Sequence, residues 1–450
     1  MALFSQDHLN PGVKKREVFG WAMYDFANSG YTTVVLTAVF SAYFAGVVAQ
    51  KAEWATFAWT VALSISYAIV MLTMPTLGAL ADLRATKKRF LLLSTAGCVV
   101  TTAALALAGP GTVALAMVLI VLSNAFYSYG ESLAAAFLPE LARRDSLGTV
   151  SGWGWSFGYL GGMLALGLSL GYVLWAQGRG IPAAEFVPVT MIITAVIYGA
   201  AAVVTFALLR ERAQPQALAL RQGGFAASLR QLKATLSQAR DYRDFVWLLA
   251  CAVFYQGGVA VVITLAAIYA EQVIGFRQSE TMALIFVLNI AAAVGAFGFG
   301  FFQDRIGHKR ALAITLIGWI ATCVIAAITT TKGGFWYAAA IAGACMGSSQ
   351  SAGRAMAGLF SPQKQLAEFY GLWTFATRLA SIIGPLMYGA ITWATGGNQR
   401  VAILSTAAMF AIGLCLLLPI NIERGRAAAD RKSTRLNSSH PRLSRMPSSA

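Results

Sequence analysis

Four ionisable side chains lie deep inside long apolar segments of this chain: the acids Asp25 and Glu131 and the bases Arg354 and Arg378. A charge in a membrane interior costs roughly 2.5–3.5 kcal/mol on insertion scales, so each needs a partner or a function. An arginine can bind a substrate carboxylate bidentately, and a carboxylate at low dielectric binds a proton more readily. The four residues predict either a polar transport path or ion pairs that lock one conformation. The two interpretations overlap, because an ion pair that breaks during a transport cycle would lock one conformation and line the path in another.

Polar neighbours share helical faces with these charges, at offsets of three, four and seven residues. Asn28, Ser29 and Thr32 lie on the face of Asp25, and Gln350 lies one turn from Arg354. We predict that one substrate and proton pathway is lined by Asp25, Asn28, Glu131, Gln350, Arg354 and Arg378.

A short motif occurs twice, about half the chain apart, each time in a basic loop between two apolar segments. It places an aspartate four positions and a lysine nine positions after a glycine, and its residues are Gly78, Asp82 and Lys87, then Gly300, Asp304, Arg305 and Lys309. An aspartate can cap or pair with a neighbouring helix end, and basic residues can contact carbonyls and acidic groups across the half. We predict that both loops hold one side of the protein shut in one state. Simple retention of positive charge in loops is the alternative, but it explains neither the spacing nor the repetition.

The elements that position these residues are membrane helices. The 450-residue chain is 58% hydrophobic and only 12% charged, whereas soluble proteins carry about 25% charged residues. Runs of about 20 apolar residues, enough to cross a bilayer, recur. They lie near 18–49, 54–81, 90–108, 112–138, 149–176, 186–209, 245–271, 281–303, 311–331, 334–360, 366–395 and 401–422. With the half-length repeat, they predict an all-α membrane protein of twelve transmembrane helices in two pseudo-symmetric six-helix bundles around a cavity.

The domain boundaries follow from these segments. We predict an N-terminal bundle over 1–209, a cytoplasmic linker with an amphipathic helix over 210–244, and a C-terminal bundle over 245–429. The stretch 430–450 looks like the translation of a sequencing adapter, so we exclude it from the fold. If each bundle holds two three-helix units, the first helix of each unit lines the cavity, and Asp25, Glu131 and Arg354 lie on such helices.

Lysine and arginine crowd one set of loops, and the opposite set holds only Lys51, Arg179, Arg277, Lys332 and Arg400. Positive loops stay in the cytoplasm, so we expect a multi-pass protein of the inner (plasma) membrane with both termini cytoplasmic. The formal net charge of +16 then reflects topology, and we predict no nucleic-acid partner.

Several kinds of chemistry are disfavoured by the sequence. The five cysteines fall inside the apolar segments without a CxxC pair, which is typical of small buried residues. We predict no metal site and no cofactor. There is no HExxH and no nucleotide-binding loop, which argues against an enzyme or an ATP-driven pump. Glycines crowd the fifth segment and Gly384-Pro385 interrupts the eleventh, so we expect close helix approach across the seam between the bundles. Ordinary core packing and a hinge explain these glycines about equally well.

The duplicated loop motif resembles the hallmark of the major facilitator superfamily, although Ala85 stands where a second glycine is usual. Three further segments are similar to its vacuole-effluxer-like branch, also called the unknown major facilitator family: 21–31, 151–162, and 350–354 followed by 368–372. The resemblance implies a permease whose two halves rock. Fungal relatives in this branch are associated with amino-acid efflux from vacuoles.

We therefore expect a secondary active transporter, a symporter or antiporter, that moves a small solute by alternating access. The expected partners are a small-molecule substrate, protons and the lipid bilayer, and we expect a monomer. Amino-acid efflux is the option that the resemblance adds. One alternative is an exporter of amphipathic drugs or lipids, which aromatic residues such as Tyr24 and Trp373 would suit. Another is a non-transporting membrane receptor or scaffold.

Overall fold

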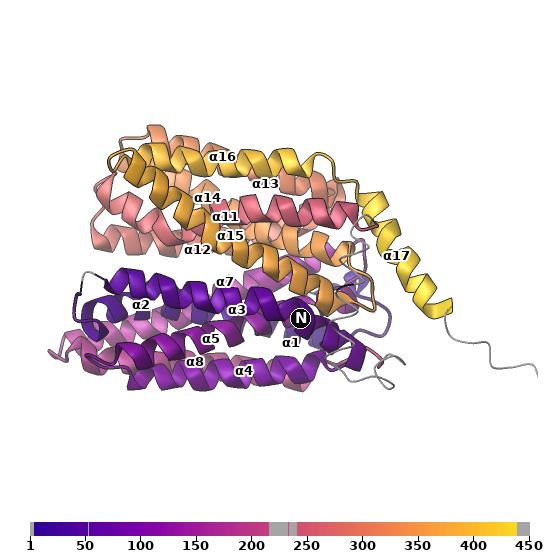
Figure 1. Cartoon of the computed structure of the whole chain (residues 1–450), viewed down its shortest axis with the longest axis horizontal. Coiled ribbons are helices and arrows are strands. Elements are labelled where there is room, and N and C mark those ends of the chain that lie inside the picture. Colours follow the sequence, from indigo (N-terminus) through magenta and orange to yellow (C-terminus); the bar gives the residue numbers. More distant parts are fainter. Residues whose placement is uncertain (1–3, 53, 216–232, 234–240, 439–450) are drawn as a thin grey trace, which may run out of the picture.

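The computed structural model describes residues 4–52, 54–215, 233 and 241–438, and its long elements are all helices. They form two bundles that lie one above the other in Figure 1. The lower bundle in that view contains the helices up to α8, and the upper one contains α11 to α16.

The N-terminal bundle begins with one long irregular span. It runs through α1 (Lys15–Tyr31), the π-helical η2 (Thr32–Ala38), α2 (Phe40–Tyr43) and the π-helical η3 (Phe44–Val48). The remaining spans are α3 (Ala55–Arg84), α4 (Lys87–Ala104) with η4 (Leu105–Leu107), α5 (Val113–Ala135) with α6 (Leu138–Leu141), α7 (Leu147–Gln177) and α8 (Ala183–Leu208).

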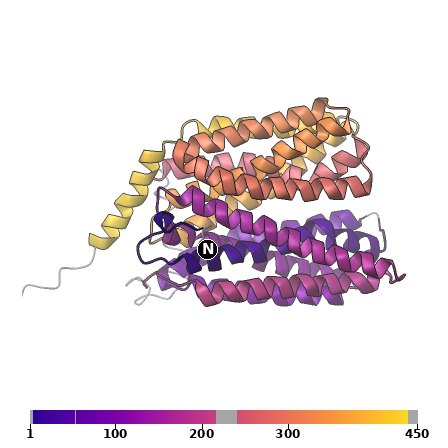
Figure 2. The ribbon, with the colours of Figure 1, turned by 180° about the vertical axis from the view of Figure 1, so that it is seen from behind.

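The C-terminal bundle contains α11 (Arg243–Gln272), α12 (Gln278–Ile306), α13 (His308–Ile328), α14 (Lys332–Leu359), α15 (Leu366–Ala394) and α16 (Gln399–Leu417). A last helix, α17 (Ile422–Ser438), projects away from the bundle, as both views show (Figures 1 and 2). The boundary predicted at 429/430 falls within α17. The core of the amphipathic helix predicted in the linker lies outside the described residues.

Ten helical segments of the described chain are long and apolar enough to cross a membrane. The other two predicted spans correspond to α14 and α15, which have 28 and 29 residues but do not belong to these ten. They carry Arg354 and Arg378 among glycines, serines and threonines, and this composition suits a helix that faces a polar interior. Large apolar side chains such as Leu72, Val203 and Val294 are exposed on the outside, where lipid would cover them.

The glycines of the fifth span pack on both bundles. A side chain at Gly158 or Gly161 would meet α1 of the same bundle, whereas one at Gly152 would meet the Ala296 carbonyl of α12 and one at Gly154 would meet both Asp25 and Arg354. Close approach across the seam is thus confirmed at Gly152 and Gly154, and the other glycines serve packing within a bundle, as does Gly384, which packs on Gly257 of α11.

The expectation of five buried cysteines fails at Cys415, which is exposed, whereas Cys98, Cys251, Cys323 and Cys345 are buried.

The two bundles join at the end where the motif loops lie. The Ser156 hydroxyl of α7 donates to the Ala293 carbonyl of α12 (2.5 Å), and the Ser132 hydroxyl of α5 donates to the Tyr370 carbonyl of α15 (3.2 Å). The N-terminal segment lies at this end too, since Leu9 pairs with Ala142 in a β-bridge. The seam centres on two helix pairs, α7 with α12 and α3 with α15, and α14 and α5 add contacts with α7 and α15 respectively.

The motif glycines make these crossings possible. A Cβ atom at Gly78 would collide with the Ala367 carbonyl at the start of α15, and one at Gly300 would lie 2.8 Å from the Gly148 carbonyl of α7. Neither obstacle is a flexible side chain, so a larger residue must push the helices apart.

We expect Gly78→Ala to destabilise the joined end by about 1–3 kcal/mol, the usual cost of overpacking. Gly298→Ala in α12 is the matched control, because a Cβ atom there meets nothing within 4 Å. Thermal unfolding of the detergent-solubilised proteins should give a lower Tm for Gly78→Ala than for Gly298→Ala. Equal Tm values would contradict the packing argument.

Candidate functional site

The first ion pair joins the two bundles. The Arg354 Nη1 of α14 donates to the Asp25 Oδ2 of α1 at 2.7 Å, and the two side chains are 8% and 12% exposed. Taking two charges out of water is costly, and a buried pair offsets this cost only when the remaining polar atoms of both side chains also form hydrogen bonds.

The remaining guanidinium nitrogens of Arg354 bind α7. Its Nη2 donates to the Ser151 carbonyl at 2.7 Å, and its Nε donates to the Ser151 hydroxyl at 3.1 Å. The guanidinium carbon lies 4.8 Å from the centre of the Trp21 ring and 5.3 Å from that of Trp155. These cation–π contacts add to the charge pairing, because both rings lie in a partly desolvated site.

The second ion pair is built from the same kinds of residue. Arg378 of α15 donates through Nη2 to Glu131 of α5, and its guanidinium carbon lies 5.6 Å from the ring of Tyr67 and 5.7 Å from that of Tyr127. The Glu131 side chain is 34% exposed, so this pair is wetter than the first.

Both acids therefore come from the N-terminal bundle and both arginines from the C-terminal bundle. The sequence is compatible with a polar path or with ion pairs among these four charges, and in the structure they form two ion pairs. A motion that separates the bundles must break each pair and leave a carboxylate and a guanidinium without partners. A proton or a substrate charge can then replace the missing partner.

Two other predicted pathway residues bind partners outside these pairs. The Asn28 Oδ1 accepts a hydrogen bond from the Tyr198 hydroxyl at 2.9 Å, inside the N-terminal bundle. The Gln350 Oε1 accepts from the Gln256 Nε2 of α11 at 2.7 Å. Gln256 and Ser151 were not predicted as site residues, because an uncharged polar side chain in an apolar segment gives only a weak signal in the sequence.

The motif aspartates cap helices of the opposite bundle. The Asp82 Oδ2 at the end of α3 accepts from the Glu368 amide of α15 at 2.9 Å. The Asp304 carboxylate at the end of α12 accepts from the Gly148 and Thr149 amides of α7, at 2.9 and 2.7 Å. The N-cap residues of α15 and α7 make no capping hydrogen bond with their own side chains, so each cap comes from the other bundle.

The motif lysines bind within their own bundles. The Lys309 Nζ donates to the Leu418 and Ile420 carbonyls after α16, at 2.6 and 2.8 Å. In the first copy the corresponding residue is Lys88, whose Nζ donates to the Phe206 and Leu209 carbonyls at the end of α8. The shared spacing had selected Lys87, but the turn between helices is one residue longer in the first copy, so Lys88 and Lys309 are each the second residue of their helix. Arg305 is exposed.

Lys87 instead forms a buried ion pair with Glu140 of α6, with side chains 1% and 9% exposed. Nearby, the Glu211 carboxylate accepts from the Lys88 amide at 2.7 Å. Burial raises the pKa of Glu211, while the Lys88 amide and the Lys87 charge act in the opposite direction. This cluster fixes the start of α4 against the ends of α5 and α8.

We expect Lys87→Met to destabilise the protein by about 3–5 kcal/mol, because it leaves the buried Glu140 charge unpaired. The double variant Lys87→Met/Glu140→Leu should recover most of the loss in Tm, because both charges are then absent. Failure of the double variant to recover would show that the pair is not the cause.

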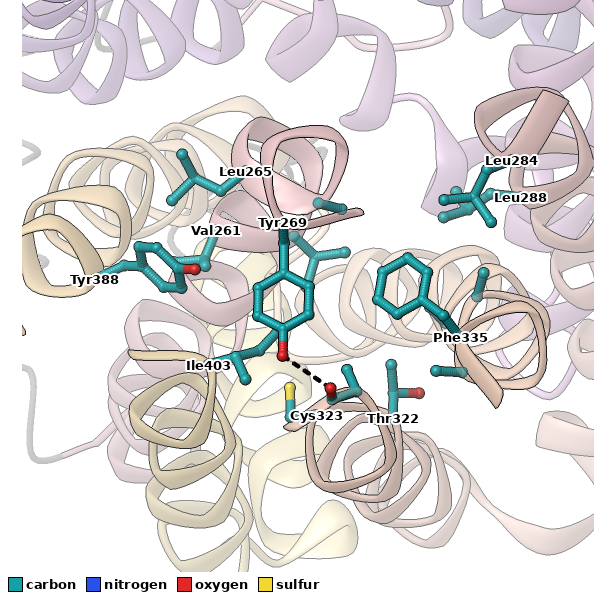
Figure 3. A pocket seen from close by; sticks show the side chains of 16 residues that line it. Val261, Leu265, Tyr269, Leu284, Leu288, Thr322, Cys323, Phe335, Tyr388 and Ile403 are labelled. Carbon is teal, nitrogen blue, oxygen red and sulfur yellow. Dashed lines mark hydrogen bonds between the residues drawn. The ribbon is translucent and has the colours of Figure 1, made fainter. Parts of the chain in front are cut away.

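A separate apolar cavity lies inside the C-terminal bundle (Figure 3). Its sixteen lining side chains carry no charge, and the Tyr269 hydroxyl that points into it donates to the Ala326 carbonyl at 2.8 Å. It is distinct from the ion pairs at the seam.

Comparisons with known proteins also indicate a transporter built from two helical bundles. The model of a family described as "Vacuole effluxer Atg22 like" matches residues 41–430. The chain belongs to this family. The resemblance seen in the sequence is thereby confirmed, and the chain is a multi-pass membrane transporter of the major facilitator type.

Relatives within the family come from bacteria and fungi. An uncharacterized MFS-type transporter of Bacillus subtilis, YxiO, is 27% identical over 402 residues, which cover 88% of this chain and 93% of that protein. Autophagy-related protein 22-1 of Penicillium rubens is 24% identical over 214 residues, 44% of this chain and 36% of that protein.

Solved structures share the fold at low identity. The transporter FucP, solved in the outward conformation, superposes with a TM-score of 0.69 at 16% identity and covers 90% of this chain and 98% of its own. The proton:xylose symporter XylE gives 0.69 at 12% identity, with 93% and 97% covered. The predicted two-bundle transporter fold is confirmed by these likenesses.

Proposed function

We propose that this protein is a proton-coupled secondary transporter that moves a small polar or zwitterionic solute by alternating access. The observation that carries the proposal is the arrangement of charge at the seam. One bundle supplies Asp25 and Glu131, and the other supplies Arg354 and Arg378.

Proton coupling would follow from the separation of the Asp25–Arg354 pair. Once the bundles part, the Asp25 carboxylate loses its cationic partner in a poorly solvated site, and a proton is the simplest replacement. Return of Arg354 would expel that proton. One proton would thus be bound and released per cycle.

Substrate binding would use the same exchange. A substrate carboxylate suits the fork of a freed arginine, and a substrate ammonium suits a freed acid. An amino acid carries both groups, which agrees with the effluxer resemblance and supports amino-acid efflux as the specific activity.

The trans-bundle caps would form the gate. In this proposal the protein lies in the plasma membrane with its basic loops and both termini in the cytoplasm, and Asp82 and Asp304 close the cytoplasmic side. The described conformation would then be closed to the cytoplasm.

Proton movement into proteoliposomes that contain a pH-sensitive dye tests the proposal. The protein would end at Ala429, and pools of amino acids, sugars, organic acids and amphipathic cations would be added in turn. Flux with one small-solute pool supports coupled transport. Flux with amphipathic cations alone would favour a drug exporter, and the absence of flux and of binding to every pool would count against transport.

A further inference from the structure

The groups that hold the Arg354 guanidinium all belong to the N-terminal bundle. Asp25 binds Nη1, and the carbonyl and hydroxyl of Ser151 bind Nη2 and Nε. Trp21 and Trp155 place their rings within 5.3 Å of the guanidinium carbon. Each of the three nitrogens thus has a hydrogen-bond acceptor on the N-terminal bundle, and the cation also has two aromatic neighbours there. The C-terminal bundle contributes indirectly, because the Ser151 hydroxyl donates to the Ser351 carbonyl of α14 at 3.0 Å.

The second ion pair lacks this completeness. The Nε of Arg378 is buried without a hydrogen-bond partner among the described residues, and its acid is more exposed. A generic ion pair between two bundles therefore does not require the full set of acceptors that surrounds Arg354.

The site also has a group that Arg354 does not use. The Nε1 of Trp155 is buried and has no acceptor in the described part of the chain. A buried donor without a partner is costly, and a bound solute that brings its own acceptor would satisfy it.

We propose that the N-terminal bundle contains a guanidinium-binding site, formed by Asp25, Ser151, Trp21 and Trp155, and that the transported solutes carry a guanidinium group. This rests on the transport function proposed above and specifies its substrate class. Arg354 is a tethered competitor that occupies the site in the described conformation. When the bundles part, a free guanidinium solute replaces it, and the return of Arg354 displaces the solute.

The geometry favours a guanidinium over an alkylammonium. The three acceptors match the spread donors of a planar fork, whose flat face stacks on aromatic rings, whereas an ammonium presents its donors from one compact nitrogen. The solute does not need a carboxylate to bind this site. The named groups are acceptors or aromatic faces, which bind a cationic donor, and only the Trp155 N–H calls for an acceptor on the solute.

Two matched ligand pairs test the proposal with the unmodified protein. Agmatine and arginine should raise the Tm of the purified protein and drive proton flux. Citrulline, which replaces the guanidinium of arginine by an uncharged group of similar shape, should bind at least about tenfold more weakly, a difference of 1.4 kcal/mol or more. Putrescine, an alkylammonium counterpart of agmatine, should also bind more weakly. Equal binding of citrulline and arginine, or stronger binding of putrescine, would overturn the proposal.

Two variants add a test of the site itself. Arg354→Ala removes the competitor, so agmatine, which has no carboxylate, should bind more tightly to this variant than to the unmodified protein. Trp155→Leu should weaken agmatine binding, whereas Trp175→Leu should not. Trp175 is the control because it lies on the same helix and its ring contacts Arg179 at 4.1 Å on an exposed surface. Equal agmatine affinities of the two tryptophan variants would contradict the assignment.

The failure of this proposal can be told apart from failure of the proposed function. Amino-acid-driven proton flux without binding of any guanidinium solute would remove the guanidinium site and leave the transporter. Guanidinium binding without proton flux would retain the site and remove the coupled transport.

Discussion

We expect Asp25→Asn to reduce substrate-driven proton flux to the level of empty vesicles. The amide keeps the shape of the carboxylate and can still accept a hydrogen bond from Arg354, but it cannot bind or release a proton. It also leaves a buried guanidinium without its counter-charge, and breaking a buried pair in this way typically costs about 3–5 kcal/mol. The measurement is the initial rate of dye response in proteoliposomes.

The control for this variant is Asp145→Asn. Asp145 lies in the same bundle, before α7, but its side chain is 68% exposed, so its replacement should leave the flux unchanged. Glu131→Gln should have a smaller effect than Asp25→Asn, because Glu131 is 34% exposed and water can replace its partner. Proton-coupled flux at the normal rate in Asp25→Asn would exclude Asp25 as the coupling group.

The second large effect is expected from the two aspartate caps. Asp82→Ala and Asp304→Ala each remove hydrogen bonds that hold one bundle on a helix end of the other. Loss of a capping side chain costs about 1 kcal/mol, so each variant should shift the equilibrium toward the cytoplasm-open state by about fivefold. The double variant should shift it by about thirtyfold, if the caps act independently.

Distances between spin labels measure this shift. Labels at Arg84→Cys and Gln363→Cys report on the α3–α15 crossing, and labels at Arg143→Cys and Arg305→Cys report on the α7–α12 crossing, in a Cys415→Ser background that removes the exposed cysteine. Each cap variant should increase the population of long distances at both crossings.

The control for the label experiment is Asp241→Asn, at an exposed position before α11. It should leave both distance distributions unchanged. Short distances retained in the double cap variant would contradict a gating role for the repeated motif.

The motif shows how far a local pattern can lead. Its spacing predicted that an aspartate meets a helix end, and the structure places both aspartates on helix N-termini. The same spacing selected Lys87 as the partner of Lys309, whereas the turn geometry makes Lys88 the equivalent residue. One additional residue in a turn rotates all later side chains by about 100° on the helix, and spacing in the sequence does not record where the helix begins.

The pathway residues show a similar division. Helical phase grouped Asn28 with Asp25, but the Asn28 side chain turns to Tyr198 on a neighbouring helix. The helical periodicity assigns a residue to a face that is about one third of a turn wide, and one neighbouring helix can cover a face of that width. Two residues assigned to the same face can therefore contact different helices.

By itself, the sequence determined the class of the protein, the positions of its apolar segments, the two-bundle repeat and the four charges within those segments. These properties depend on composition and on residues within a few turns of each other, so local physics suffices. Only the tertiary structure decided that Asp25 meets Arg354, that Glu131 meets Arg378, and that Ser151, Trp21 and Trp155 surround the Arg354 guanidinium. Those contacts join residues from different helices, some of them more than 300 positions apart, and they exist only because the bundles pack against each other.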